Sequence, residues 1–182
     1  MNHPSLNRPA APQGSPSPLQ APTPSSSVPV REFLAFKLGS EEYGVNILRV
    51  QEIRSFEKPT ALANAPADIL GVVNLRGVIV PIIDLRVRLK LAQAAYDAQT
   101  VVIVVNVGQR VVGLVVDSVS DVLTLQAEQM RPVPTLDSGF ATEHLLALGS
   151  VDDRMLILLD IEKYLATALG AATGVATDAL HS

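Results

Sequence analysis

Few side chains in this sequence have the types and spacing that acid–base or metal chemistry requires. The three histidines, His3, His144 and His181, are far apart in the chain. None of them has a nucleophile or a second ligand beside it at the spacing of a metal site or a catalytic triad. We interpret all three as solvated surface side chains.

Acidic residues form two small groups that general acid–base catalysis or ion binding could use. Asp117 and Asp121 alternate with valines, as residues on a strand face or in a bulge do. Asp152 and Asp153 fall in a predicted turn, and Asp160 follows the next apolar run. The chain has no phosphate-binding loop, dinucleotide fingerprint or nucleophile elbow. We therefore predict a protein that is not an enzyme and that uses no cofactor or metal.

Arg76 is the strongest candidate for a contact with another protein. It lies in a polar turn between two apolar runs, and its planar guanidinium offers five donors that match a partner's carboxylate. A solvated cation at a hairpin tip is the alternative. Glu52, flanked by the apolar residues Val50 and Ile53, is either a solvated strand residue or part of a mixed surface that suits a partner helix.

The stretch that positions Arg76 is GVVNLRGVIVPIIDL, residues 71–85. It predicts a β-hairpin in which Gly77 supplies the positive φ of a tight turn. Pro81 cannot donate to a ladder, so we expect it at a sheet edge or a bulge. Asp84 is expected to cap a short helix. The cations that follow, of which Arg86 is the first, are expected on the solvated face of that helix.

The chain contains an internal repeat. Gly39 and Gly44 recur 69 residues later as Gly108 and Gly113, and the strand-ending Asp84 recurs as Asp160, 76 residues later. The offset grows inside a segment that contains Pro, Ser and Gly, which predicts a longer loop there. Two copies of one β unit are therefore expected.

Each unit consists of short apolar runs separated by glycine-bearing turns, which predicts an all-β protein of two small barrels. The continuous apolar run 101–105 predicts a strand covered on both faces. Short helical pieces are expected at 66–70, 142–146 and 160–169. A barrel of this size is marginal alone, so the two should share a packed interface.

Composition narrows the function further. The 182 residues are 48% hydrophobic, include no Cys, and carry a formal net charge of −4. An acidic chain does not suit nucleic-acid binding, which depends on cationic contacts to phosphates. No apolar stretch approaches the length that spans a bilayer, and no secretion signal precedes the first strand. We expect a cytoplasmic protein.

Four segments resemble the CheW family of bacterial chemotaxis coupling proteins. They are EEYGVNILRVQEIR (41–54), GVVNLRGVIVPIIDLR (71–86), TVVIVVNVGQRVVGLVVDSVSDVL (100–123) and GSVDDRMLILLDIEKYL (149–165). The NLRG turn followed by a VIVPIIDL-like strand is a hallmark of that family. The resemblance covers about Arg31 to Leu165.

The resemblance implies two five-stranded, SH3-like β-barrels that share a core. The expected organisation is a disordered Pro/Ser-rich tail over 1–30 and a CheW-like domain over 31–165. Within this domain the first barrel covers about 31–90 and the second about 98–165, with strand exchange between them allowed. A helix end and a frayed tail are expected over 166–182.

The resemblance also implies partners. Members of the family link methyl-accepting chemotaxis receptors to the histidine kinase CheA, in arrays on the inner face of the membrane, and further CheW copies in array rings are candidate partners. Direct membrane insertion is not expected. The implied receptor-binding residues are Ile47, Val50, Glu52 and Arg76. The implied kinase-binding residues are Gly113, Val122 and Leu123, and Gly71 is interpreted as a packing residue near that surface.

Two other classes of function remain as alternatives. A small β-barrel that binds nucleic acid or a Pro-rich peptide would need a basic or aromatic face, and the chain has three Tyr, four Phe and no Trp. An enzyme would need converging polar groups. Within the CheW family, an array that serves surface motility or development would give the same sequence pattern.

Overall fold

The structure, a computed structural model, describes residue 14 and residues 30–91, 95–134 and 142–173. The tail expected over 1–30 lies outside the described residues except for residues 14 and 30. The end of the C-terminal tail, His3 and His181 also lie outside them. Eleven strands make up most of the described chain, which confirms the all-β prediction. The strands are β1 (Arg31–Leu38), β2 (Glu41–Asn46), β3 (Val50–Ser55), β4 (Ile69–Leu75), β5 (Val78–Asp84), β6 (Val101–Val107), β7 (Arg110–Val116), β8 (Ser118–Leu125), β9 (Met130–Arg131), β10 (Leu145–Val151) and β11 (Arg154–Leu159). The helices are α1 (Leu85–Arg88), α2 (Ile161–Thr173) and the 3-10 turns η1 (Ile47–Arg49), η2 (Ala127–Gln129) and η3 (Thr142–His144).

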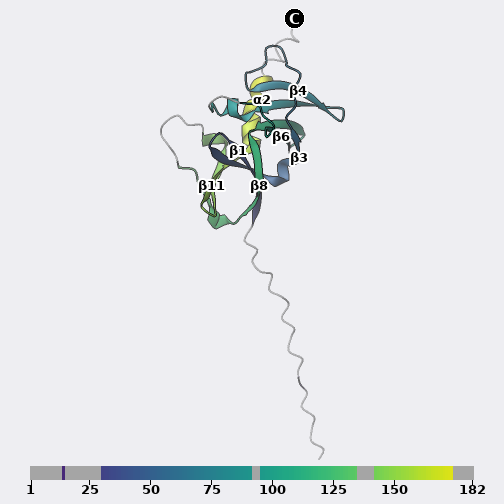
Figure 1. Cartoon of the computed structure of the whole chain (residues 1–182). Helices are drawn as coiled ribbons and strands as arrows, with labels where there is room; N and C mark the ends of the chain where they lie inside the picture. Colours follow the sequence, from purple (N-terminus) through teal and green to yellow (C-terminus); the bar gives the residue numbers. More distant parts are fainter. Residues whose placement is uncertain (1–13, 15–29, 92–94, 135–141, 174–182) are drawn as a thin grey trace, which may run out of the picture.

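The strands form two sheets, and each sheet takes strands from both halves of the chain. One has the order β8-β1-β2-β11-β10-β9 and the other β3-β6-β7-β5-β4. Figure 1 shows the first below the second. The parallel pairs β11–β2 and β5–β7 join the halves. The division of the chain at about residue 90 therefore does not separate the sheets.

The hydrophobic core has three parts, because successive strand residues point to opposite faces. Ile103 and Val105 of β6 face a core shared by the two sheets, whereas Val102 and Val104 face the interior of the five-stranded sheet. A third cluster, around Phe33, fills the six-stranded sheet. The prediction of a strand at 101–105 covered on both faces is confirmed.

The β4–β5 hairpin has the predicted two-residue turn. Arg76 and Gly77 have φ of 52° and 87°, and the Asn74 side chain accepts a hydrogen bond of 2.8 Å from the Gly77 N–H. The β10–β11 hairpin repeats this turn with Asp152 and Asp153, whose φ angles are 46° and 62°. These two acids therefore serve a turn, which the internal repeat predicted.

Some local predictions are wrong. Pro81 lies in β5, which is an internal strand, and its missing donor is tolerated because pairing with β7 begins only at Ile82. Residues 66–70 do not form a helix, because β4 starts at Ile69. Of the helical piece predicted at 142–146, only Thr142–His144 form a 3-10 turn, because β10 starts at Leu145. The predicted helix after Asp160 is confirmed as α2.

Arg86 is buried, not solvated as its position in a basic stretch suggested. Its side chain is 2% exposed and forms ion pairs of 2.9 Å with both Asp84 and Asp117. It also donates to the carbonyl oxygen of Ala95 and lies over the ring of Tyr96, 4.8 Å from the ring centroid. The predicted cap is confirmed, because the Asp84 carboxylate accepts from the Arg86 N–H at 2.9 Å. This network ties α1 to the corner between β7 and β8.

The five-stranded sheet is closed by the segment after β3. Thr60 exchanges two backbone hydrogen bonds of 2.9 Å with Val72 of β4. Gly71 permits this approach, because a Cβ at this position would lie 2.1 Å from the Thr60 carbonyl oxygen. Its φ of 146° also disfavours any side chain. Gly71 is thus a packing residue at the seam of the sheet.

Replacing Gly71 with alanine should lower the free energy of unfolding by about 2–3 kcal/mol, since backbone strain and overpacking each cost about 1–3 kcal/mol. Gly39→Ala is the matched control, because Gly39 also has a positive φ (62°) but has nothing within 4 Å of its Cβ position. We expect the control to lose about 1 kcal/mol. Equal losses in urea unfolding would show that the contact with Thr60 contributes nothing.

Candidate functional site

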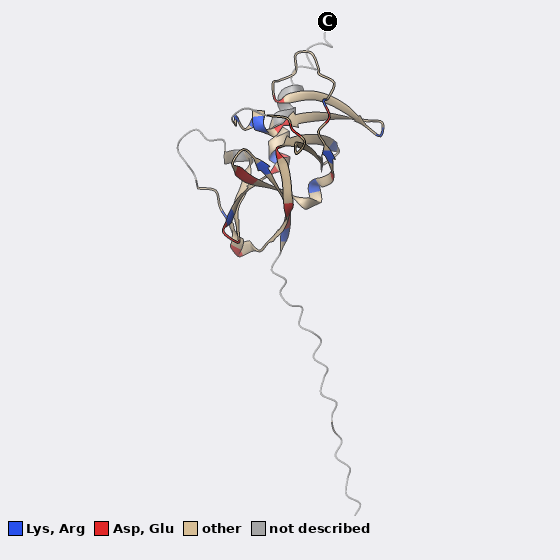
Figure 2. Ribbon diagram, in the orientation of Figure 1, with Lys and Arg blue, Asp and Glu red and all other residues tan. Residues whose placement is uncertain are grey.

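An ion pair joins the two ends of the five-stranded sheet. Arg76, at the tip of the β4–β5 hairpin, donates to Glu52 of β3 at 2.7 Å. Figure 2 shows the basic tip of this hairpin. Because β3 and β4 are the outermost strands of the sheet, this contact requires the sheet to curl until its ends meet. The hydrogen bond from Arg76 lowers the pKa of Glu52 below its ordinary value, against the opposing effect of burial.

Arg76 remains 68% exposed while it holds Glu52. A guanidinium has more donors than one carboxylate can accept, so donors remain for a second acceptor. On the side of Glu52, the Arg54 guanidinium lies 3.5 Å from the other carboxylate oxygen. Arg76 is therefore a surface cation whose orientation is fixed by its contact with Glu52.

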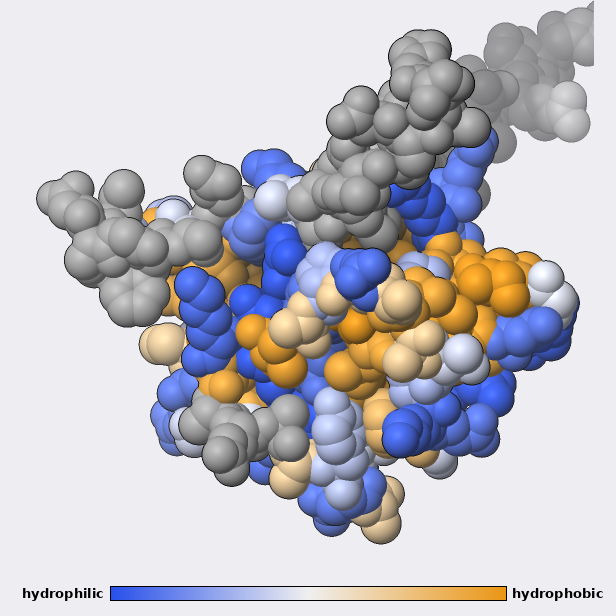
Figure 3. Space-filling view, turned by 90° about the horizontal axis from the view of Figure 1, so that it is seen from above, coloured by the Kyte–Doolittle hydropathy of each residue, from blue (hydrophilic) through white to orange (hydrophobic). Residues whose placement is uncertain are grey.

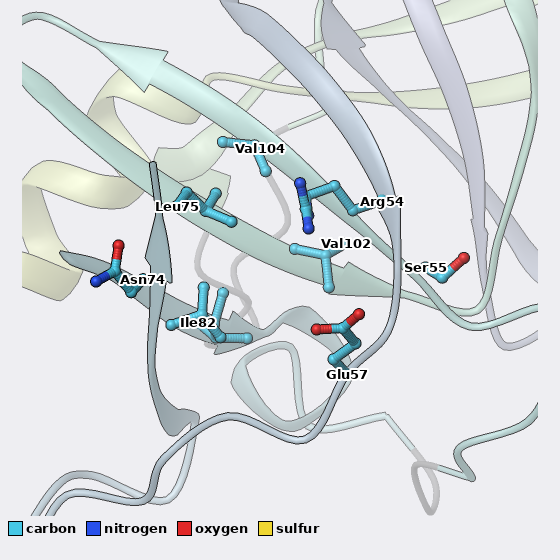
Figure 4. A pocket seen from close by; sticks show the side chains of 9 residues that line it. Arg54, Ser55, Glu57, Asn74, Leu75, Ile82, Val102 and Val104 are labelled. Atoms are coloured by element: carbon cyan, nitrogen blue, oxygen red, sulfur yellow. The ribbon is translucent and has the colours of Figure 1, made fainter. Parts of the chain in front are cut away.

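The opening between β3 and β4 is too small for a substrate. Its cavity is about 60 Å³ and is lined by apolar residues such as Val102 and Val104 with Arg54 and Glu57 beside them (Figure 4). Ligand pockets are typically about 300–1,000 Å³. Among the described residues, no three His, Asp or Glu side chains cluster as metal ligands would.

Val50, the third predicted receptor-binding residue, lies on the opposite face of β3, and the fourth, Ile47, lies in the turn η1 just before this strand. Val50 pairs with Val105, which faces the shared core, whereas Glu52 pairs with Val104, which faces the sheet interior. Ile47 and Val50 are both half-buried against the shared core. Glu52 and Arg76 thus form one contact, whereas Ile47 and Val50 pack on the shared core from η1 and from the other face of β3.

Exposed apolar side chains also lie on β3 and β5 of the five-stranded sheet. Ile53 lies on the same face of β3 as Val50 and is 46% exposed, and Ile79 of β5 is 61% exposed. Figure 3 shows hydrophobic residues gathered in a band across the face of the molecule seen from above. Sequence reasoning named Ile53 only as an apolar neighbour of Glu52 in a mixed surface, and it missed Ile79.

The three predicted kinase-binding residues do not lie together. Val122 and Leu123 belong to β8, an edge strand of the six-stranded sheet. Val122 is 51% exposed, and Leu123 packs on the interior of that sheet. Gly113 lies in β7 of the other sheet, where a Cβ would come within 2.5 Å of Ile82. Gly113 is buried and its lack of a side chain lets these strands pack, and its part in a kinase contact stays a prediction.

Asp117 and Asp121, the other acidic group considered in the sequence, each take part in an ion pair. Asp121 of β8 and Glu42 of β2 both bind Arg154 of β11. Hydrogen bonds from Arg154 lower the pKa of both carboxyl groups. Asp117 accepts from Arg86 and, at 2.6 Å, from the Gly39 N–H. Asp117 and Asp121 thus occupy separate networks and do not form an acid pair.

No helix among the described residues is long and apolar enough to cross a membrane.

The chain is similar to proteins of one family. A family model described as the CheW-like domain matches residues 32–169. Chemotaxis protein CheW of Klebsiella aerogenes is 61% identical over 137 residues, which cover 75% of this chain and 82% of that protein. A probable chemotaxis protein CheW of Rhizobium etli is 43% identical over 132 residues, covering 72% and 85%.

A more distant relative and a solved structure extend the similarity. Protein FrzA of Myxococcus xanthus is 32% identical over 142 residues, covering 77% of this chain and 88% of the relative. The crystal structure of the scaffolding protein TtCheW from Thermoanaerobacter tengcongensis superposes with a TM-score of 0.67 at 29% identity. The match covers 71% of this chain and 88% of that structure. The two-sheet fold described above is shared with that scaffold.

Proposed function

This chain belongs to the CheW family of chemotaxis coupling adaptors, and we propose that it joins methyl-accepting chemotaxis receptors to the histidine kinase CheA without catalysing a reaction. The observation that carries the receptor part of the proposal is the exposed Arg76 held by Glu52, together with exposed isoleucines in β3 and β5, Ile53 and Ile79. This surface offers both an apolar contact and a fixed cation. Membership of the family at 61% identity to a chemotaxis protein CheW supports the general role.

The receptor surface suits a helix with an acidic residue. The receptors that CheW proteins serve have tips that are helical hairpins. The apolar face of a helix can pack on Ile53 and Ile79. An acidic side chain on the flank of the same helix can accept hydrogen bonds from the remaining donors of Arg76. The charged contact then fixes the register of the helix on the apolar surface.

The kinase surface is proposed at the edge strand β8. Val122 gives this edge an exposed apolar residue, and the Arg154 network next to it holds Asp121 in place. An apolar residue surrounded by fixed charges is typical of a small protein–protein contact. Because β8 and β3 belong to different sheets, receptor and kinase can bind at the same time.

Each contact is expected to be weak alone. Small interfaces, below about 1,000 Å², belong to transient complexes. Two separate surfaces on one rigid body raise the effective concentration of one partner at the other, and copies in an array add to this avidity. The proposed place of action is therefore the cytoplasmic side of the membrane, where receptor tips, kinase and further copies of this protein meet.

A pull-down with the full chain immobilised tests the proposal. Purified CheA and a receptor cytoplasmic fragment are added separately and together. We expect each to be retained weakly alone and more strongly when both are present. If neither is retained, or if one excludes the other, the chain does not couple them through separate surfaces.

Ile53→Asp should weaken retention of the receptor fragment by about tenfold, because it places a charge in an apolar contact worth about 1.5 kcal/mol or more. Ile53 is a sharper probe than Val50, which is half-buried against the shared core and would also lose stability. Met155→Asp is the matched control, since Met155 is an exposed apolar residue of the other sheet. Equal retention of both variants would contradict the assignment.

A role like that of FrzA is the second candidate. The identity to Protein FrzA is 32%, against 61% for the chemotaxis protein of Klebsiella aerogenes. The difference favours the chemotaxis adaptor. Retention of a receptor from the organism's swimming array, measured against receptors of its other arrays, distinguishes the two.

A further inference from the structure

A cavity of about 640 Å³ lies between the residues that follow α1, the turn η3 and helix α2. Tyr43 of β2 and Ile157 of β11 also line it. It shares no residue with the receptor and kinase surfaces proposed above. Its volume is within the range of about 300–1,000 Å³ that small-molecule pockets occupy, whereas the opening beside β3 is far below it.

Two polar groups in the wall of this cavity have no hydrogen-bond partner among the described residues. The Tyr164 hydroxyl is one, in a side chain that is 1% exposed, and Nδ1 of His144 is the other. The two rings meet edge to face with centroids 5.5 Å apart. Burial raises the pKa of Tyr164, so its hydroxyl remains a donor. An unpaired buried polar group is unfavourable and indicates a missing partner.

The charge of the cavity favours an anion. Arg88 lies over the Tyr164 ring at 5.5 Å from its centroid and binds Asp68 at 3.1 Å. Lys90 adds a second cation to the lining. Two carboxylates, Asp68 and Asp84, lie near enough to raise the pKa of Tyr164, but neither lines the cavity, and the Arg88 guanidinium has donors beyond the one that Asp68 accepts. The other lining residues are mainly aliphatic, among them Leu89 and Leu145.

We propose that this cavity binds a small amphipathic carboxylate. The carboxylate accepts hydrogen bonds from the Tyr164 hydroxyl and from Arg88, and the apolar body of the ligand packs on Leu89, Leu145 and Ile157. This arrangement gives the buried hydroxyl its partner and offsets the excess cation. Binding would be independent of the adaptor function.

Titration with 1-naphthylacetate tests the site, and neutral 1-naphthylacetamide of the same shape is the control. Calorimetry and amide chemical shifts of the full-length protein are the readouts. We expect the acid to bind with a dissociation constant below about 10 mM, to shift amides of η3 and α2, and to bind at least about fivefold more tightly than the amide. Equal binding of the two, or shifts confined to other elements, would overturn the proposal, as would no binding.

Tyr164→Phe separates binding from a structural role. Removal of the hydroxyl should weaken binding of 1-naphthylacetate by about fivefold, the effect of one hydrogen bond. Without ligand, the same variant should keep or raise the melting temperature, because it removes an unpaired buried group. Arg88→Gln should also weaken binding, whereas the exposed Arg110→Gln should not. A lower melting temperature of Tyr164→Phe without ligand would show that the hydroxyl already has a structural partner.

Discussion

Replacing Arg86 with methionine should lower the free energy of unfolding by about 3–5 kcal/mol, the largest loss expected from any single substitution considered above. Removal of one partner of a buried ion pair leaves the other charge without compensation. Asp84 is fully buried, and Asp117 would lose its partner as well. Because small domains have only about 5–15 kcal/mol of stability in total, the variant should unfold at a much lower urea concentration.

Two further variants separate charge from packing. Lys90→Met likewise replaces a cation by methionine, four residues further along the chain at an exposed position, and should change stability by less than about 0.5 kcal/mol. Asp84→Asn combined with Arg86→Met removes both charges and should be more stable than Arg86→Met alone. If the double variant is the less stable one, the shape of the arginine matters more than its charge.

The pH dependence gives an independent test of the same pair. Burial would raise the pKa of Asp84, but hydrogen bonds from Arg86 and Tyr96 outweigh it and hold this pKa below the ordinary value. The stabilisation from Asp84 is therefore complete above the unfolded pKa of about 3.9 and is lost as pH falls through the folded value. Without Arg86, burial dominates and the pKa rises. The difference in stability between parent and Arg86→Met should then shrink as pH falls from 7 towards 5.

The error about Arg86 shows what local sequence could not supply. The strand-ending Asp84 correctly indicated the start of a short helix. The burial of the side chain depends on Asp117, 31 residues away, which closes over it from the corner between β7 and β8. A pattern within one segment gives the faces of that segment but not which face another segment covers.

The two sheets illustrate the same limit at a larger scale. Hairpins and glycine turns were predictable, because the residues that form them are close in sequence. The pairs that join the two halves of the chain within each sheet, such as Ile82 with Gly113 in β5 and β7, are parallel and distant in sequence. The family resemblance placed Gly113 on a binding surface, and the structure adds that its missing side chain makes room for Ile82 inside the sheet. Among the predicted receptor residues, only the contact between Glu52 and Arg76 depends on the curl of the whole sheet, which a local sequence pattern does not show.

Reversing the charge of Arg76 to glutamate should weaken activation of CheA in receptor-containing membranes by about tenfold or more, with little change in the urea midpoint. The first effect follows because a charge-assisted hydrogen bond to a partner is worth about 1.5–3 kcal/mol and a second acid would repel the partner as well. The second follows because surface ion pairs add little to stability. Arg110→Glu, at the exposed start of β7, is the control of equal charge and should activate normally.

The charge-swapped protein, with Glu52→Arg and Arg76→Glu, decides what the pair is for. It restores an ion pair between the hairpin tip and β3 but places the exposed charge of opposite sign where Arg76 stood. If the pair only holds the curl of the sheet, the swapped protein should regain activation. If Arg76 meets a receptor carboxylate, as proposed, the swapped protein should remain as defective as Arg76→Glu, because the anchored group facing the receptor is then an acid. Recovery by the swap would remove Arg76 from the receptor contact and leave the isoleucines as its basis.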